Sequence, residues 1–212
     1  MLPLFLDLAG RRVVLVGGGR VAAAKLPSLL AAGADVCVVA PAIDRDIERA
    51  GVRIERRGFV AGDLDTAWLV VAAATPEVNR EVAEAANLRR IFVNAVDDPS
   101  NATAFLSGVV SRDGVTIAIS TSGEAPALTA LLREALDAVL PRDLSNWLAE
   151  ARRQRAVWRR DGLAMEKRRP LLLAALNALY EKARTEHRTP GETAGEASAD
   201  SARLGVRVSE NL

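Results

Sequence analysis

The sequence predicts an α/β fold with a doubly wound parallel sheet, and three observations support this fold class. Short, continuous apolar runs such as Val13–Val16 are typical of parallel strands that are buried on both faces. These runs alternate with helical segments, which implies right-handed crossovers between parallel strands. A glycine-rich turn, Gly17–Gly19, follows the first run and precedes a helical segment.

Local signals define the elements of this first region. A helix from Val21 to Ala32 is expected to end at Gly33. Thr75 and Pro76 predict the start of another helix, with a cap hydroxyl and a proline at the first helical position. The expected strands are Val13–Val16, Val36–Val39, Val52–Ile54, Trp68–Ala73 and Ile91–Val93.

The pattern changes in the second half of the chain. Phe105–Ser111 and Val115–Ser120 are strand-like, and the intervening Arg112–Gly114 predicts a hairpin turn. A helix is expected over Pro126–Val139, closed by Pro141. The hairpin either adds an antiparallel extension to the sheet or pairs with another subunit, and we favour the second arrangement.

The remaining sequence predicts a helical region and a tail. From Leu144 onward, apolar residues recur at helical spacing. From Thr185 the chain is rich in small and polar residues, so we expect a disordered tail. The expected organisation is a nucleotide-binding domain (1–104), a dimerisation region (105–141), a helical domain (142–184) and the tail (185–212).

Composition excludes several classes of protein. The chain has 212 residues, 50% hydrophobic and 26% charged, with a formal net charge of +1, which is typical of a globular protein rather than a polycation for nucleic acid. One Cys and one His exclude a disulfide framework and a Cys/His zinc site. The short apolar start at Met1–Leu6 lacks a basic flank, and no run approaches a membrane span. We therefore expect a cytoplasmic protein with no metal site and no membrane partner.

The glycine turn carries the first functional signal. Residues Gly17–Ala22 match G-x-G-x-x-G/A between a strand and a helix. Gly17 permits the tight turn, Gly19 lets the backbone approach a pyrophosphate, and Ala22 allows close packing of helix and strand. We therefore favour dinucleotide binding over a purely structural turn. The acidic residue that usually binds the ribose is missing, because Asp44 lies beyond Pro41, and NAD and NADP both remain open on this ground.

Three stretches of the sequence form a specific combination, namely Gly10–Pro41, Val93–Pro99 and Thr116–Pro141. Together they resemble the precorrin-2 dehydrogenase and sirohydrochlorin ferrochelatase family, which also forms the N-terminal half of multifunctional sirohaem synthase. The resemblance is strong from Leu2 to about Pro141 and weaker to about Lys182. It implies an oxidoreductase that uses NAD to convert precorrin-2 to sirohydrochlorin, and in many members the insertion of Fe²⁺ as a second substrate. It also implies a homodimer with a Rossmann domain.

The resemblance assigns roles to individual residues. Asp97 matches the family's catalytic aspartate, and a carboxylate after a parallel strand suits a general base. Asp98 is better explained by a turn. Thr121 and Ser120 match the loop that binds substrate, although a helix cap explains Thr121 equally well. Ser122 and Glu124 depart from the family pattern. The implied cofactor contacts are Gly17, Gly18, Gly19, Arg20, Val21, Pro41 and Ala42.

Two other functions are also consistent with the glycine turn. A nucleotide-sensing module or a tetrapyrrole carrier without activity would share the glycine turn. Cys37 is expected to be a core residue, and His187 to have no ligand role. An arginine-rich stretch is more simply a solvated helix surface than a device that steers an octacarboxylate substrate; its members are Arg152, Arg153, Arg155, Arg159 and Arg160.

Overall fold

The computed structural model describes residues 1–186, with the side chains of 182–186 excepted. Its internal contacts divide the described residues into two units, residues 1–111 with 116–140 and residues 112–115 with 141–186. Of the predicted tail, all but Thr185 and Glu186 lies outside the described residues, and so does His187. Within residues 1–186, none of the helices combines the length and apolar character needed to cross a membrane.

A parallel five-stranded sheet forms the centre of the first unit, so the predicted fold class is confirmed. The strand order is β3-β2-β1-β4-β5, which places the change of winding direction between β1 and β4. The strands are β1 (Arg12–Val16), β2 (Asp35–Val39), β3 (Arg53–Glu55), β4 (Leu69–Ala72) and β5 (Phe92–Ala95).

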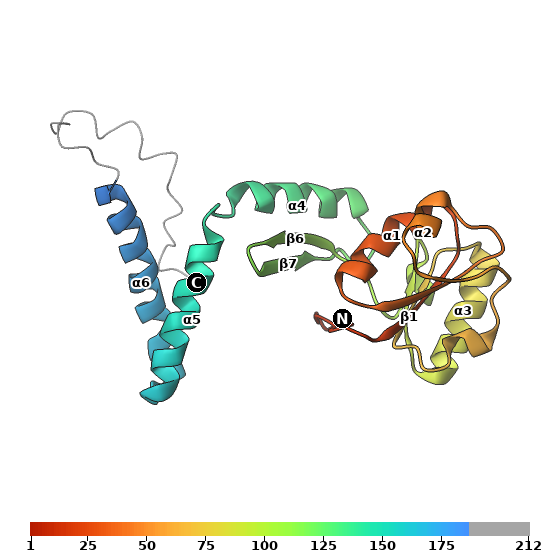
Figure 1. The fold of residues 1–212 in the computed structure, drawn as a ribbon, viewed down its shortest axis with the longest axis horizontal. Helices are drawn as coiled ribbons and strands as arrows, with labels where there is room; N and C mark the ends of the chain where they lie inside the picture. The colour runs from red at the N-terminus through yellow and green to blue at the C-terminus, as the bar shows by residue number, and fades with distance from the viewer. Residues whose placement is uncertain (187–212) are drawn as a thin grey trace. The chain divides into compact units, whose positions relative to one another are not determined.

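Two core layers follow from the alternation of side chains along the strands. Val13 and Leu15 pack against α1 (Arg20–Ala31) and α2 (Arg45–Arg49) on one face of the sheet. Val14 and Val16 pack against α3 (Pro76–Arg89) on the other face, and Figure 1 shows these helices on opposite sides of the strands. Every one of these valines and leucines is at most 2% exposed, which explains why the strands are continuously apolar in sequence.

Cys37 lies in β2 within the layer that faces α3. It is 4% exposed, as expected for a core residue. Burial raises the pKa of its thiol, so the side chain is a protonated, apolar packing element at neutral pH.

Two details of the helices differ from the sequence prediction. Thr75 occupies the cap position of α3, but its hydroxyl makes no capping bond to the helix backbone and instead bonds to Glu77. The short helix α2 was not predicted, because five residues are too few to show a helical period. Asp44 nevertheless starts this helix, since its Oδ1 accepts from the backbone N–H of Asp46 at 2.9 Å.

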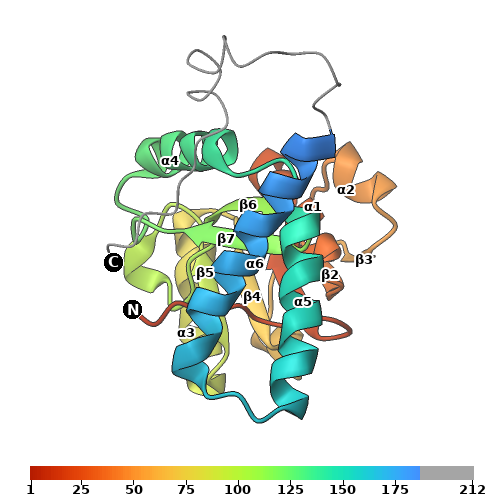
Figure 2. The ribbon, with the colours of Figure 1, turned by 90° about the vertical axis from the view of Figure 1, so that its left-hand side faces the viewer.

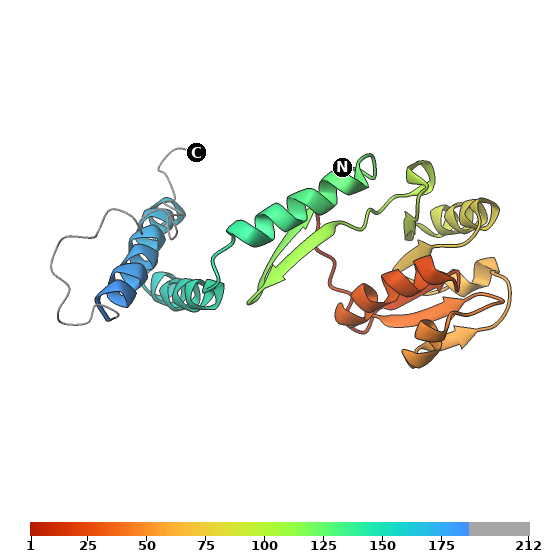
Figure 3. The same ribbon diagram turned by 90° about the horizontal axis from the view of Figure 1, so that it is seen from above.

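The predicted hairpin forms a separate two-stranded sheet and does not extend the parallel one. Its strands are β6 (Gly108–Arg112) and β7 (Val115–Ile119). The predicted strand began at Phe105, so the prediction was wrong for residues 105–107, which precede β6. The helix α4 (Pro126–Val139) has the predicted bounds and lies beside the hairpin, as Figure 3 shows. None of the α4 residues is buried within this chain.

The second unit consists mainly of a helical pair, α5 (Leu144–Arg160) and α6 (Met165–Glu186), which lie side by side in Figure 2. The indole N–H of Trp147 donates to the hydroxyl of Tyr180 at 2.7 Å, and their rings meet edge to face with centroids 6.0 Å apart. Arg168 donates to the carbonyl of Leu163 and so fixes the turn between the helices. Two short 3-10 helices complete the described elements, Ala61–Leu64 and Pro99–Asn101.

A partly buried ion pair fastens the loop that follows β3. The guanidinium of Arg57 donates to Asp63 at 2.9 Å, and the N–H of Val60 donates to the same carboxylate. The Arg57 hydrogen bond holds the pKa of the Asp63 carboxyl below its ordinary value. Because the folded-state pKa is lowered, this stabilisation is present above the pKa of the unfolded chain. It is lost as the pH falls through the folded-state pKa.

We predict that Asp63→Asn lowers the free energy of unfolding at neutral pH by about 1–3 kcal/mol, because Arg57 and Val60 lose a charged acceptor. Urea unfolding followed by circular dichroism measures this change, and the difference from the unaltered protein should shrink in acid. Asp46→Asn is the control, since its pair with Arg49 is exposed and is worth about 0–1 kcal/mol. Equal losses in the two variants would contradict the prediction.

Candidate functional site

The glycine turn is a point where three loops meet through their backbones. A Cβ on Gly17 would lie 2.2 Å from the carbonyl oxygen of Ala73, after β4, and one on Gly18 would lie 2.0 Å from that of Ala42, after β2. Gly17 also has φ of 118°, which side chains rarely permit. The N–H of Asp44 donates to the carbonyl of Gly18 at 2.7 Å. These contacts require glycine at both positions.

The first turn of α1 suits the phosphates of a dinucleotide. Gly19 is the N-cap residue of the helix, so no side chain caps the first N–H groups, and the first turn has no acidic residue. The space next to Gly19 is open, because a Cβ there would meet nothing within 4 Å. The free N–H groups and the helix dipole there favour an anion. Ala22 is 0% exposed and lets α1 approach the sheet closely. The residues present therefore fit a dinucleotide.

The other predicted cofactor contacts surround this turn. Arg20 and Val21 are exposed in the first turn of α1, and Pro41 and Ala42 are exposed after β2. No acidic residue occurs between β2 and Asp44, and the Asp44 carboxylate caps α2. A ribose 2′-hydroxyl therefore meets no free carboxylate from this loop.

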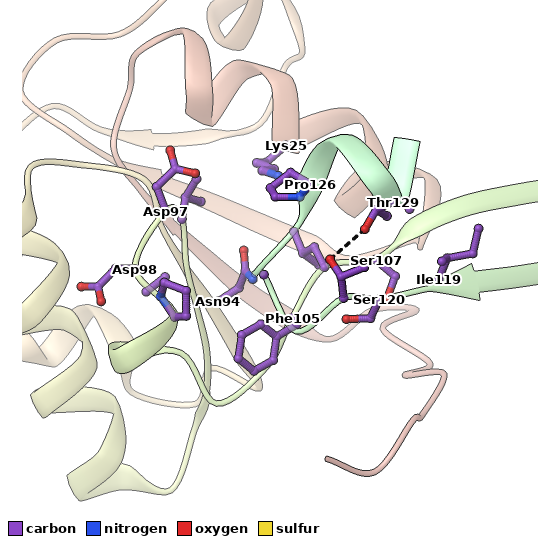
Figure 4. Close-up of a pocket in the computed structure, with 17 residues that line it drawn as sticks. Lys25, Asn94, Asp97, Asp98, Phe105, Ser107, Ile119, Ser120, Pro126 and Thr129 are labelled. Carbon is purple, nitrogen blue, oxygen red and sulfur yellow. Dashed lines mark hydrogen bonds between the residues drawn. The ribbon is translucent and has the colours of Figure 1, made fainter. Parts of the chain in front are cut away.

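A pocket of about 320 Å³ lies beside the carboxyl end of β5. Its wall combines α1, the segment after β5, the hairpin and the start of α4, all within the first unit (Figure 4). The predicted catalytic and substrate residues, Asp97, Ser120 and Thr121, all line it. Its polar and charged lining side chains are Lys25, Asn94, Asp97, Asp98, Ser107, Ser120, Thr121 and Thr129.

Asp97 and Asp98 have different environments in this pocket. The Asp98 carboxylate accepts from Asn101 and Ser100, each at 2.6 Å, and these bonds hold its pKa below its ordinary value. Figure 4 shows Asp98 turned away from Lys25. Asp97 is exposed and accepts no hydrogen bond from any residue in the described part of the chain. Its φ of 58° is a conformation that aspartate tolerates better than most residues.

The two predicted substrate hydroxyls also differ. The Oγ1 of Thr121 accepts from the N–H of Ala125 at the start of α4 and lies 3.0 Å from the hydroxyl of Thr129. Thr129 in turn donates to the carbonyl of Ala125 at 3.3 Å, so Thr121 acts within the loop as a cap. Ser120 accepts from the N–H of Ser122, but its own O–H has no acceptor among the described residues. Of these two hydroxyls, Ser120 is therefore the one with a donor left for a ligand.

Four polar or charged residues of the pocket wall were not predicted from the sequence, namely Lys25, Asn94, Ser107 and Thr129. Asn94 is 7% exposed, and its side-chain amide donates to the carbonyl of Ala104 at 3.0 Å, which holds the chain after the 3-10 helix against β5. A sequence signal existed for Asn94, because an amide within a buried apolar strand requires a specific partner. Among residues 1–186, no group of three or more His, Cys, Asp or Glu side chains is arranged to hold a metal ion.

The fold and the site define a dinucleotide-binding α/β protein with a small-molecule pocket at the carboxyl edge of its sheet. Two family models match the chain: one described as putative NAD(P)-binding, over residues 4–108, and one described as sirohaem biosynthesis protein central, over residues 112–138. A solved structure described as SirC, precorrin-2 dehydrogenase, aligns with a TM-score of 0.60 and 26% identity. The alignment covers 81% of this chain and 87% of that one.

Curated relatives agree with these matches. Siroheme synthase 3 of Aeromonas hydrophila subsp. hydrophila is 44% identical over 148 residues, which are 68% of this chain and 32% of that protein. Siroheme synthase 2 of Yersinia pestis (strain Pestoides F) is 40% identical over 173 residues, which are 79% of this chain and 37% of that protein. The chain belongs to the family of precorrin-2 dehydrogenases and sirohaem synthases, and it contains an NAD(P)-binding domain. It spans roughly a third of the length of these two synthases.

We predict that NADH and NADPH bind with dissociation constants within about 10-fold of each other, because the β2 loop has no free carboxylate to repel the 2′-phosphate. Fluorescence titration of each reduced nucleotide measures both constants. Ala42→Asp should weaken NADPH binding by about 10-fold and leave NADH binding unchanged, whereas Ala42→Asn should change neither. Discrimination greater than about 100-fold by the unaltered protein would contradict this prediction.

Proposed function

We propose that this chain catalyses the oxidation of precorrin-2 to sirohydrochlorin with NAD as the acceptor. The observation that carries the proposal is the Asp97 carboxylate, which accepts no hydrogen bond from residues 1–186 and lies at the same edge of the sheet as the glycine turn. Val96 donates its N–H to the carbonyl of Ala72, and the next residue, Ala73, contacts Gly17 by its backbone. The glycine turn and the segment that carries Asp97 are thus linked by a continuous set of backbone contacts. The family membership supports the same activity.

The glycine turn and the pocket have different roles in this reaction. Oxidation of precorrin-2 removes a hydride with its electron pair and one proton. When bound, NAD supplies the acceptor for the hydride. The Asp97 carboxylate accepts the proton as general base and releases it to water, to which it is exposed. Asp98 cannot share this role, because Asn101 and Ser100 already occupy its oxygens.

The hydroxyl of Ser120 is proposed to donate to a substrate carboxylate from the opposite wall of the pocket. Thr121 supports that wall by capping α4 and bonding to Thr129. Glu124 stands in the same loop but does not line the pocket. Its negative charge therefore does not argue against an anionic substrate.

Insertion of Fe²⁺ into sirohydrochlorin is a second candidate activity of the same pocket. The Asp97 carboxylate, which has no hydrogen-bond donor among the described residues, favours it, because metal insertion displaces two pyrrole protons that need an acceptor. An oxygen donor also binds Fe²⁺ weakly enough to release it to the macrocycle. The rate of iron insertion under anaerobic conditions, compared with the rate without protein, tests this activity.

We predict that Asp97→Asn reduces kcat for precorrin-2 oxidation by about 100-fold or more, the usual contribution of a general base. Anaerobic kinetics of NADH formation measure this loss, with thermal stability and NADH binding unchanged. Asp113→Asn is the matched control, because Asp113 is also exposed and has a φ of 51° at the hairpin turn. Full turnover by Asp97→Asn would refute the assignment. Failure of the unaltered protein to form NADH would instead favour a carrier or a nucleotide sensor.

A second copy of the chain is proposed to cover α4, which supports the expected homodimer. One face of this helix carries an exposed apolar stripe of Leu128, Leu131, Leu132 and Val139, between 41% and 64% exposed. The opposite face contains Arg133 and Asp137. The neighbouring two-stranded sheet would be only marginally stable by itself, so a partner surface would stabilise both elements.

We predict that Leu131→Asp converts a dimer of the chain to a monomer, because burial of an unpaired carboxylate in the stripe is unfavourable. Light scattering after size-exclusion chromatography measures the mass. Ala130→Asp, on the other face of α4, should leave the dimer intact. A monomeric mass for the unaltered protein would contradict the proposal.

A further inference from the structure

Lys25 is a basic side chain in the wall of the pocket, and neither the glycine motif nor the proposed chemistry uses it. It lies in the second turn of α1, next to the buried stripe formed by Ala22, Leu26 and Leu29. The residue is half-buried, so this stripe provides an apolar surface for its alkyl stem. Figure 4 shows Lys25 near Pro126, on the same side of the pocket as Asp97.

The ammonium group of Lys25 has no ion-pair or hydrogen-bond partner among the described residues. Two other basic residues of the first unit are paired, Arg57 with Asp63 and Arg89 with Asp65. A half-buried cation with no protein partner, at the edge of a cavity, is available to a ligand.

Lys25 offsets part of the negative charge that the pocket wall presents to an anionic ligand. Its ionisable lining residues are Lys25, Asp97 and Asp98. Without Lys25, the wall would present two carboxylates to the substrate, and an octacarboxylate would be repelled. With Lys25, one substrate carboxylate gains a charge-assisted hydrogen bond inside the pocket.

We propose that Lys25 is a specificity-determining residue that binds a peripheral carboxylate of the tetrapyrrole and so orients the macrocycle toward Asp97. This inference rests on the proposed function, because it names how that same site recognises its substrate. Lys25 donates no proton to the reaction and accepts none. Its removal therefore weakens substrate binding without removing the base.

Kinetics with precorrin-2 and NAD test this role directly. Lys25→Met should raise KM for precorrin-2 by about 10-fold or more, with a smaller change in kcat and no change in KM for NAD. Lys25→Arg keeps the positive charge and should retain most of the affinity. Lys167→Met is the matched control, because Lys167 is exposed in the first turn of α6 and does not line the pocket.

Binding of a stable porphyrin separates this inference from the proposed activity. Fluorescence quenching measures the affinity for uroporphyrin, an octacarboxylate, and for coproporphyrin, a tetracarboxylate, without any turnover. Lys25→Met should lose about 10-fold in uroporphyrin affinity, and Lys167→Met should lose none.

Two results would overturn the role of Lys25: unchanged uroporphyrin affinity and precorrin-2 KM in Lys25→Met, or a rise confined to the KM for NAD. The second result would assign Lys25 to the cofactor. If the unaltered protein formed no NADH but Lys25→Met still lost porphyrin affinity, the proposed activity would fail while the binding role of Lys25 stood. If Lys25→Met failed to fold, a folded Lys25→Arg variant that lost about 10-fold in uroporphyrin affinity, although it keeps the positive charge, would count against the role.

Discussion

The close backbone contact of the glycine turn with its neighbouring loops is the constraint on which the rest of the structure depends. Gly17 meets Ala73 and Gly18 meets Ala42 at distances that exclude a Cβ. This contact brings together the loops after β1, β2 and β4, where the sheet changes its winding direction. It also fixes the first turn of α1, and through α1 the position of Lys25. The close approach at Gly17 and Gly18 therefore positions both the predicted nucleotide-binding turn and part of the pocket wall.

The sequence predicted the fold well wherever one local signal decided the outcome. Buried parallel strands must be continuously apolar, and Pro126 sets the start of α4 by its fixed φ, so these elements were found. The order of the strands was not predictable from local pattern, because it depends on which strands pair across the chain. Phe105 and Leu106 are apolar enough for a strand, but residues 105–107 all line the pocket and pair with no neighbouring strand.

The pocket shows why a motif alone does not assign roles to adjacent side chains. Asp97 and Asp98 are neighbours of the same type, yet hydrogen bonds from Asn101 and Ser100 occupy only Asp98. Likewise Thr121 and Ser120 are both hydroxyl residues, and their hydrogen-bond partners distinguish their roles. Thr121 accepts from the N–H of Ala125 at the start of α4, whereas the O–H of Ser120 has no acceptor among the described residues. Lys25 could not be found from sequence, because its significance lies in a cavity formed by segments about 70 to 100 residues away. Such distinctions arise from tertiary contacts.

The location of Cys37 gives this chain a built-in reporter of its own unfolding. It is the one cysteine in the sequence, and it is 4% exposed in β2, between β1 and β3 at the interior of the sheet. A thiol-reactive reagent acts on the thiolate, and burial keeps this thiol protonated. Alkylation therefore requires the strands around β2 to separate. The labelling rate measures how often the nucleotide-binding sheet opens in the native protein, with no engineered probe.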